Sequence, residues 1–267
     1  MSGKEGVVAV VTGGSSGIGR CVCESLAQKG AAVYELSRRK CENKGIIHIG
    51  CDVTDESQVA AAAEEILKAE GKIDILINCA GFGIGGAVEF TDTKDAQRQL
   101  DVNFFGTVRA VKAVLPSMRE RKRGRIVNIS SVASSVPIPF QTYYSASKAA
   151  IDSYTAALAN EVRPFNISVC AVRPGDIASG FTGARVKNAG GEEEYSGRIG
   201  KSLSKMEKDE TQGMSPAACG AYIAKIALKK RVKPYYSFGF VYKLFCVLAK
   251  ALPCGLVNRV IYILYAK

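Results

Sequence analysis

Histidine is almost absent from this chain of 267 residues, since His48 is the only one. We expect His48 to be an ordinary residue of a strand, so a catalytic triad built on histidine and a metal site with several histidine ligands are both excluded. Cysteine pairs suited to a metal are also missing, because Cys21 and Cys23 would lie on different faces of a helix. The nine cysteines are therefore expected to be reduced thiols of a cytoplasmic protein, with no metal site.

Long apolar runs are missing as well. A membrane-spanning helix needs about 20 consecutive apolar residues, and Lys or Arg interrupts the longest apolar stretches here. The residues that follow Met1 lack the apolar segment of a signal peptide. No Pro/Ser-rich linker divides the chain, so the hydrophobic residues, 47% of the total, are expected to form the core of a single domain.

Acidic residues are absent from one end of the chain. Residues 221–267 contain nine Lys or Arg and no Asp or Glu, so the first 220 residues carry little of the net charge of +11. Most of the protein therefore lacks the basic surface of a nucleic-acid-binding protein, and we expect no nucleic-acid partner.

Within residues 235–267 the sequence predicts a basic amphipathic helical extension. Apolar residues fall on one face of the first helix, and Lys243 and Lys250 fall on the opposite face. Such a helix can rest on an anionic membrane surface, or it can pack on the domain or on a second subunit. The apolar face comprises Phe238, Val241, Tyr242, Phe245, Leu248, Ala249 and Leu252.

Runs of β-branched residues alternate with helical patterns in the first 173 residues. The predicted strands are 7–11, 32–36, 46–50, 73–78, 125–131 and 167–173, and the predicted helical segments are 17–29, 55–70, 95–120 and 144–163. This alternation predicts an α/β fold with one doubly wound parallel sheet of the Rossmann type and helices on both faces. The domain would span residues 1–234, with residues 175–215 as a substrate lid or a mobile surface excursion.

A glycine-rich turn follows the first predicted strand and opens the first helix. Its backbone can approach a pyrophosphate closely, and the helix N-terminus offers amide groups to the charge. The turn therefore predicts a dinucleotide site, to which it would contribute Gly13, Ser15, Ser16, Gly17, Ile18 and Gly19.

The end of the second strand indicates which dinucleotide is bound. If the strand ends at Ser37, then Ser37, Arg38 and Arg39 can accept the 2′-phosphate of NADP(H). If it ends two residues earlier, Glu35 would hold a ribose hydroxyl and favour NAD. We place the end at Ser37 and expect NADP(H).

Tyr144 and Lys148 lie one helical turn apart, where positive charge can lower the pKa of the phenol. Thirteen residues earlier, Ser131 ends the fifth predicted strand, at the edge where parallel sheets bind ligands. These three residues therefore predict a site that exchanges a proton with a substrate oxygen.

The order of these motifs resembles the short-chain dehydrogenase/reductase family over about the first 180 residues. Asn103 falls on the helix asparagine of the family's catalytic tetrad, whose other members would be Ser131, Tyr144 and Lys148. Cys79 departs from the family's second asparagine, and Ser179 stands near its usual threonine. Further cofactor contacts implied by the resemblance are Asp52, Val53, Asn78, Ala80, Gly81, Tyr144, Lys148, Pro174, Gly175, Ile177 and Ser179.

The resemblance implies a mechanism and an assembly. Ser131 would hold the substrate oxygen and Tyr144 would exchange its proton. Lys148 would bind the nicotinamide ribose and lower the pKa of Tyr144, and Asn103 would hold a water. A homodimer or homotetramer would form through the helices at 102–120 and 144–163.

The predicted pocket walls are apolar, which indicates a ketone or alcohol on a lipophilic body. We expect a hydroxysteroid dehydrogenase first, for a steroid or bile acid. The alternatives are a lipid-ketone reductase, of the acyl-dihydroxyacetone-phosphate, 3-ketosphinganine or 3-oxoacyl-carrier-protein type, and a non-catalytic NADP(H)-binding scaffold, which would be expected to lack part of the tetrad. Predicted substrate contacts are Ser131, Tyr144, Phe82, Ile84, Val132, Ile138, Phe140 and Phe181.

Overall fold

The computed structural model describes residues 6–40, 45–188 and 190–267. In this part of the chain, seven strands form one parallel sheet in the order β3-β2-β1-β4-β6-β7-β9. The strands are β1 (Val8–Thr12), β2 (Ala32–Ser37), β3 (Ile46–Gly50), β4 (Ile75–Asn78), β6 (Gly124–Ile129), β7 (Ile167–Pro174) and β9 (Tyr235–Phe238).

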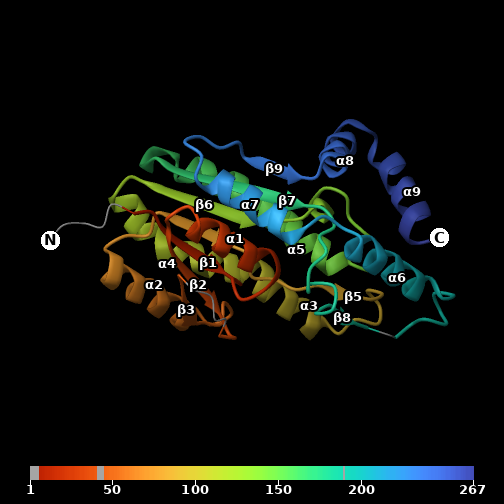
Figure 1. The fold of residues 1–267 in the computed structure, drawn as a ribbon. Helices are drawn as coiled ribbons and strands as arrows, with labels where there is room; N and C mark the ends of the chain where they lie inside the picture. Colours follow the sequence, from red (N-terminus) through yellow and green to blue (C-terminus); the bar gives the residue numbers. More distant parts are fainter. Residues whose placement is uncertain (1–5, 41–44, 189) are drawn as a thin grey trace.

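Helices cover both faces of this sheet (Figure 1). On one face, α1 (Gly17–Ala27) and α7 (Pro216–Ala227) bury apolar side chains against the strands. On the other face, α2 (Glu56–Glu70), α4 (Gly106–Glu120) and α5 (Thr142–Glu161) enclose a second core. The predicted doubly wound Rossmann-type sheet is thereby confirmed.

Two stretches of the chain differ from the prediction. The predicted helical segment 95–120 is α3 (Thr93–Leu100), a π-helical turn η1 (Asp101–Phe105) and α4. The seventh strand, β9, pairs parallel with β7 and was missed, so placing Phe238 on the amphipathic helix was wrong. A run of only four residues has no periodicity long enough to separate a strand from the start of a helix.

The segment after β7 forms a wall beside the carboxyl ends of the strands. A two-stranded sheet joins β5 (Ile84–Gly85) to β8 (Val186–Lys187), and α6 (Arg198–Thr211) follows. Short helical turns η2 (Val132–Ser134) and η3 (Arg163–Phe165) lie elsewhere in the chain.

The last two helices, α8 (Phe240–Ala251) and α9 (Cys254–Tyr265), project at one end of the molecule near α6 (Figure 1). The chain reaches its C-terminus there. Among the described residues, no helix is both long and apolar enough to span a membrane.

Candidate active site

One cavity of about 1300 Å³ runs along the carboxyl ends of the strands and contains most of the predicted site. Parallel strands open their carboxyl ends at the same edge, which explains how motifs far apart in sequence meet here. Of the predicted cofactor contacts, those that line it are Gly13, Ser15, Ser16, Gly17, Ile18, Gly19, Ser37, Arg38, Arg39, Asp52, Val53, Ala80, Gly81, Tyr144, Lys148, Pro174, Gly175, Ile177 and Ser179.

The loop between β1 and α1 is shaped for the close approach of a phosphate. Gly13 has φ +68°, a conformation that side chains rarely adopt. A Cβ atom on Gly19 would lie 2.2 Å from the carbonyl oxygen of Gly13, so only glycine fits there. The bare backbone leads into the N-terminus of α1, which suits the pyrophosphate of a dinucleotide.

Strand β2 ends at Ser37, as predicted, and Glu35, the acid two residues earlier, does not line the cavity. Glu35 is buried, accepts a hydrogen bond from Ser37 Oγ at 3.2 Å, and contacts the ring of His48. His48 lies in β3 as expected, but it is also the partner of a buried carboxylate. Arg38 is largely exposed at the cavity, 3.9 Å from Asp52.

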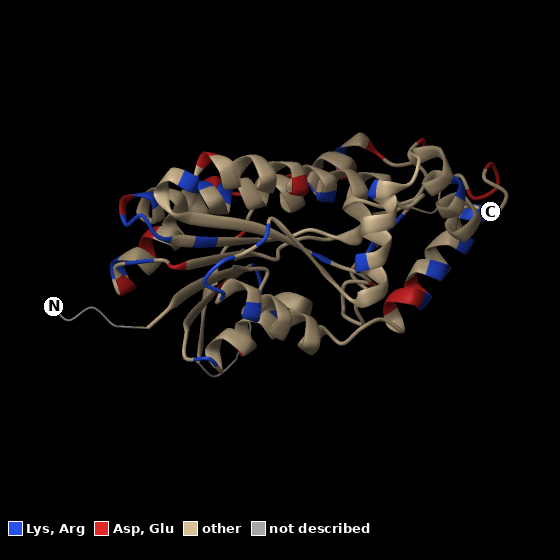
Figure 2. Ribbon diagram, turned by 90° about the horizontal axis from the view of Figure 1, so that it is seen from above, with Lys and Arg blue, Asp and Glu red and all other residues tan. Residues whose placement is uncertain are grey.

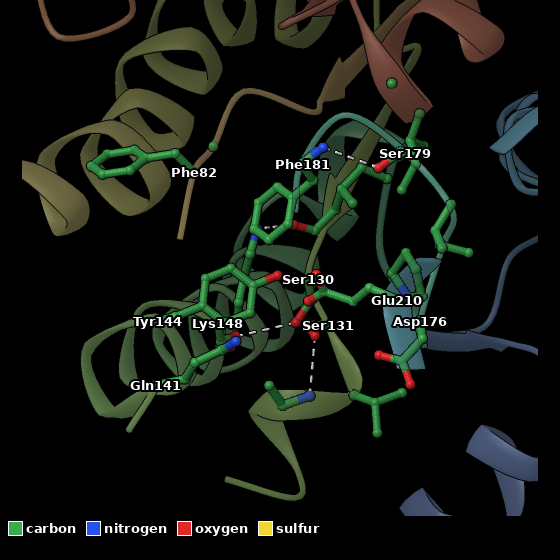
Figure 3. Close-up of a pocket in the computed structure, with 18 of the residues that line it drawn as sticks. Phe82, Ser130, Ser131, Gln141, Tyr144, Lys148, Asp176, Ser179, Phe181 and Glu210 are labelled. Carbon is green, nitrogen blue, oxygen red and sulfur yellow. Dashed lines mark hydrogen bonds between the residues drawn. The ribbon is translucent and has the colours of Figure 1, made fainter. Parts of the chain in front are cut away.

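The predicted catalytic residues Ser131, Tyr144 and Lys148 lie close together beside the cavity, just after β6 and on α5 (Figure 3). Ser131 follows β6, and its Oγ accepts a hydrogen bond from the amide of Ala133 at 3.1 Å. Lys148 Nζ donates to the carbonyl of Ile129 at 2.8 Å and lies 5.6 Å from the centre of the Tyr144 ring. The helical spacing thus places the ammonium beside the phenol.

Burial dominates the acid–base properties of this pair. It raises the pKa of Tyr144 to about 12, a shift that the hydrogen bond with Ser131 opposes and the carboxylate of Glu210 increases. Burial also lowers the pKa of Lys148 to about 8. In this structure, therefore, burial outweighs the influences that lower the pKa of the phenol, and the lowering by Lys148 that the resemblance implies stays a prediction.

Asn103 and Asn78 hold the cavity walls in place without lining the cavity. Asn103 lies in the π-helical turn and exchanges hydrogen bonds of 3.0 Å with the backbone N–H and C=O of Phe82. Asn78 donates to Asn128 at 2.9 Å, joining β4 to β6. Whether Asn103 also holds a water, as the resemblance implies, stays a prediction.

The predicted substrate contacts divide into two groups. Phe82, Val132, Ile138 and Phe181 line the cavity, whereas Ile84 and Phe140 do not. Ile84 is buried in β5, and Phe140 packs against the ring of Tyr195. The Phe181 ring lies 5.6 Å from that of Tyr144, so it borders the reaction site.

The sequence did not indicate that α8 and α9 form a wall of this cavity. The apolar face of the extension was recognised, but a periodic pattern does not reveal what the face packs against. The apolar lining residues from these helices are Tyr242, Phe245, Leu248, Ala249, Leu252, Leu256, Val257, Val260, Ile261, Leu264 and Tyr265.

Three charged side chains of the lining, Arg98, Asp176 and Glu210, were also missed. Arg98 lies 5.3 Å from the centre of the Phe82 ring and pairs with Asp95 at 3.3 Å. Asp176 directly follows the Pro174-Gly175 motif, and that position was the available signal for it. Glu210 reaches the site only because α6 folds back over it.

Comparisons with known proteins agree with this geometry. The family model for short chain dehydrogenases matches residues 7–190. A 3-ketodihydrosphingosine reductase of Bacteroides thetaiotaomicron is 41% identical over 97% of this chain and 98% of its own. A probable short-chain type dehydrogenase/reductase of Helicobacter pylori, VdlC, is 31% identical over 92% of this chain and 93% of its own.

A similar structure has also been solved. A short-chain dehydrogenase of Streptomyces avermitilis superposes with a TM-score of 0.82 and 29% identity, over 96% of this chain and 94% of its own. Fold, motif order and tetrad geometry all agree with the family match. This chain therefore belongs to the short-chain dehydrogenase family and is an oxidoreductase that acts on CH–OH and C=O groups with a nicotinamide cofactor.

Proposed function

We propose that this enzyme is an NADP(H)-dependent reductase of a long-chain lipid ketone of the 3-ketodihydrosphingosine kind. The observation that carries the proposal is the apolar wall that α8 and α9 add to the cavity. Each helix has 12 residues, a length of about 18 Å. A wall of this length suits an extended acyl chain, and the 41% identical relative is named for such a substrate.

The roles of the tetrad follow from its positions. When bound, the nicotinamide would supply a hydride to the carbonyl carbon. Ser131 holds the carbonyl oxygen by a hydrogen bond, and Tyr144 transfers its phenol proton to that oxygen as the negative charge develops. Lys148 keeps positive charge beside the phenolate that remains, and Asn103 fixes the neighbouring loop through Phe82.

The choice of NADP(H) over NAD(H) rests on the end of β2. Arg38 and Arg39 line the cavity there, whereas Glu35 is buried and is held by Ser37 and His48. A guanidinium at this place can form charge-assisted hydrogen bonds with a 2′-phosphate.

A peripheral contact with a membrane fits the same substrate. Several apolar side chains of α8 and α9 are exposed yet do not line the cavity, among them Phe240 at 83% and Ile263 at 55%. Acidic and basic positions both occur along the helices that cover the sheet (Figure 2), but residues 221–267 have no acid. We propose that this apolar and basic surface rests on anionic lipid, with the enzyme otherwise cytoplasmic.

Self-assembly remains part of the proposal, as a homodimer or homotetramer through α4 and α5. Phe105, just before α4, is 48% exposed, and the neighbouring Phe104 packs against Tyr154 of α5. These rings provide an apolar patch between the two helices.

A substrate panel tests the proposed function against the steroid alternative. Purified enzyme would be supplied with NADPH or NADH and with 3-ketodihydrosphingosine, 3-, 7-, 12- and 17-ketosteroids, or a 3-oxoacyl thioester. We expect turnover of the long-chain ketone with NADPH, followed as loss of NADPH absorbance. Turnover of a ketosteroid alone would establish a hydroxysteroid dehydrogenase, and turnover of no ketone would favour a non-catalytic scaffold.

A further inference from the structure

The cavity is mostly apolar, yet two carboxylates lie on the side that faces the catalytic phenol. Asp176 comes from the loop after β7, and Glu210 comes from α6. Figure 3 shows the Glu210 side chain pointing toward Tyr144, with Asp176 beside it. Both carboxylates raise the pKa of Tyr144, so both lie within electrostatic reach of the group that protonates the substrate.

The two carboxylates differ in how their charge is balanced. Glu210 pairs with Arg185 and accepts a hydrogen bond from Thr182 Oγ1 at 2.6 Å. Asp176 accepts a hydrogen bond of 2.7 Å from the Tyr242 hydroxyl, which is neutral. In the described part of the chain, no Lys, Arg or His lies within 4.0 Å of the Asp176 carboxylate.

The lack of a counter-ion matters because Asp176 is partly buried. Burial raises its pKa, and the charges of Glu210 and Asp209 raise it further. A carboxylate withdrawn from water is stabilised when a cation takes the place of the lost solvent. The charge of Lys205 lowers the pKa of Asp176, but Lys205 pairs with Asp209 at 3.0 Å.

The residues behind these two carboxylates are buried and closely packed. The side chain of Arg185 is 0% exposed, and its Nε and Nη1 have no hydrogen-bond partner among the described residues. The Tyr242 ring packs on Gly175, where a Cβ atom would lie 2.2 Å from it. Tyr242 therefore holds Asp176 in place from α8.

We propose that Asp176, supported by Glu210, binds an ammonium group on the carbon next to the ketone that Tyr144 protonates. The proposal rests on the proposed function and assigns the recognition of the substrate's head group to named residues. It predicts a preference for a 2-amino-3-ketone over a ketone without the amine. It also disfavours substrates with a phosphate at this end, because the carboxylates would repel it.

The test compares two ketones that differ only in the amine. The enzyme would be supplied with NADPH and either 3-ketodihydrosphingosine or the 1-hydroxy-3-ketone of the same chain length. We expect the ratio of kcat/KM for the two to favour the amine at least ~10-fold, the effect of one charge-assisted hydrogen bond. Asp176→Asn keeps an acceptor for Tyr242 but removes the charge, so this ratio should fall about tenfold, chiefly through the KM of the amino ketone.

Glu207→Gln is the matched control, because Glu207 lies on α6 with Glu210, pairs with Lys187 at 2.6 Å and does not line the cavity. It should leave the ratio unchanged. Equal kcat/KM values for the two ketones in the wild-type enzyme, or an unchanged ratio in Asp176→Asn, would overturn the subsite while leaving the reductase intact. Turnover of neither ketone would instead overturn the proposed function.

Inhibition of the wild-type enzyme gives a second test that does not depend on any variant. A long-chain alkylammonium ion should compete with the amino ketone about tenfold more tightly than the alcohol of the same length. Equal inhibition by the two would contradict an ammonium site.

Discussion

The two sides of the cavity are formed by different kinds of interaction. The side formed by β6, η1 and α5 is fixed by hydrogen bonds, such as those from Lys148 to Ile129 and from Asn103 to Phe82. The side formed by α8 and α9 consists of apolar side chains, and many are exposed, including Phe245 and Leu248. The first side carries the predicted catalytic residues, whereas under the proposed function the second binds the lipid chain mainly through apolar contact.

The two sides also differ in what they would lose on mutation. Removing a buried polar partner leaves its neighbour without a hydrogen bond, which changes the rate of the reaction sharply. Trimming an apolar wall reduces affinity in proportion to the area lost. Variants on the two sides should therefore differ in the size of their effect, and we expect the largest effect at Tyr144.

Tyr144→Phe removes the proton donor and keeps the ring. We expect turnover to fall by ~10²–10⁴-fold, the usual contribution of a general acid. Cofactor binding, measured by NADPH fluorescence, should persist. Turnover close to that of the wild-type enzyme would refute the role of Tyr144.

Rising pH should affect the reaction rate through the charge of Lys148. The pKa of Lys148 is lowered to about 8, so its positive charge is present below that pH and is lost above it. The kcat/KM for ketone reduction should be flat below about pH 8 and fall as the pH rises through it. A profile that stays flat to pH 10 would show that the charge of Lys148 is not required.

Arg38→Asp changes the cofactor end of the cavity. It replaces a guanidinium that can hold a 2′-phosphate with an acid that repels it, so preference should shift from NADPH toward NADH by ~10–100-fold. The measurement is the ratio of kcat/KM for the two cofactors. An unchanged ratio would remove Arg38 from the 2′-phosphate site.

Leu248→Ala trims the apolar side. Leu248 lines the cavity, whereas the adjacent Val247 does not and is 55% exposed. We expect the KM for a long-chain ketone to rise about three- to tenfold through lost apolar contact, with kcat little changed. Val247→Ala is the control, and an equal effect from it would argue against an acyl channel along α8.

Lys243→Gln tests the membrane surface and should have the smallest effect. One basic residue near an anionic bilayer contributes about 1 kcal/mol, so partition onto anionic vesicles should weaken about fivefold. Lys29→Gln, an exposed position outside α8 and α9, is the control. Equal binding to neutral and anionic vesicles would contradict the proposed surface.

The two sides of the cavity also differ in how far they could be predicted from the sequence. The glycine turn, Ser131, Tyr144 and Lys148 are local motifs, and the parallel sheet brings their strand ends to one edge, so the fold and the catalytic side could be predicted. The position of α6 and the orientation of α8 and α9 depend on long-range packing. Asp176 and Glu210 meet only through that packing, which no spacing in the sequence reveals.

The most direct measurement of the central claim follows the hydride itself. The enzyme would be supplied with 3-ketodihydrosphingosine and NADPH that carries deuterium at both positions of nicotinamide C4, and the product would be analysed by mass spectrometry. We expect deuterium on carbon 3 of the amino alcohol, and its loss in Tyr144→Phe. An unreduced amino ketone in a preparation that reduces a ketosteroid would contradict it.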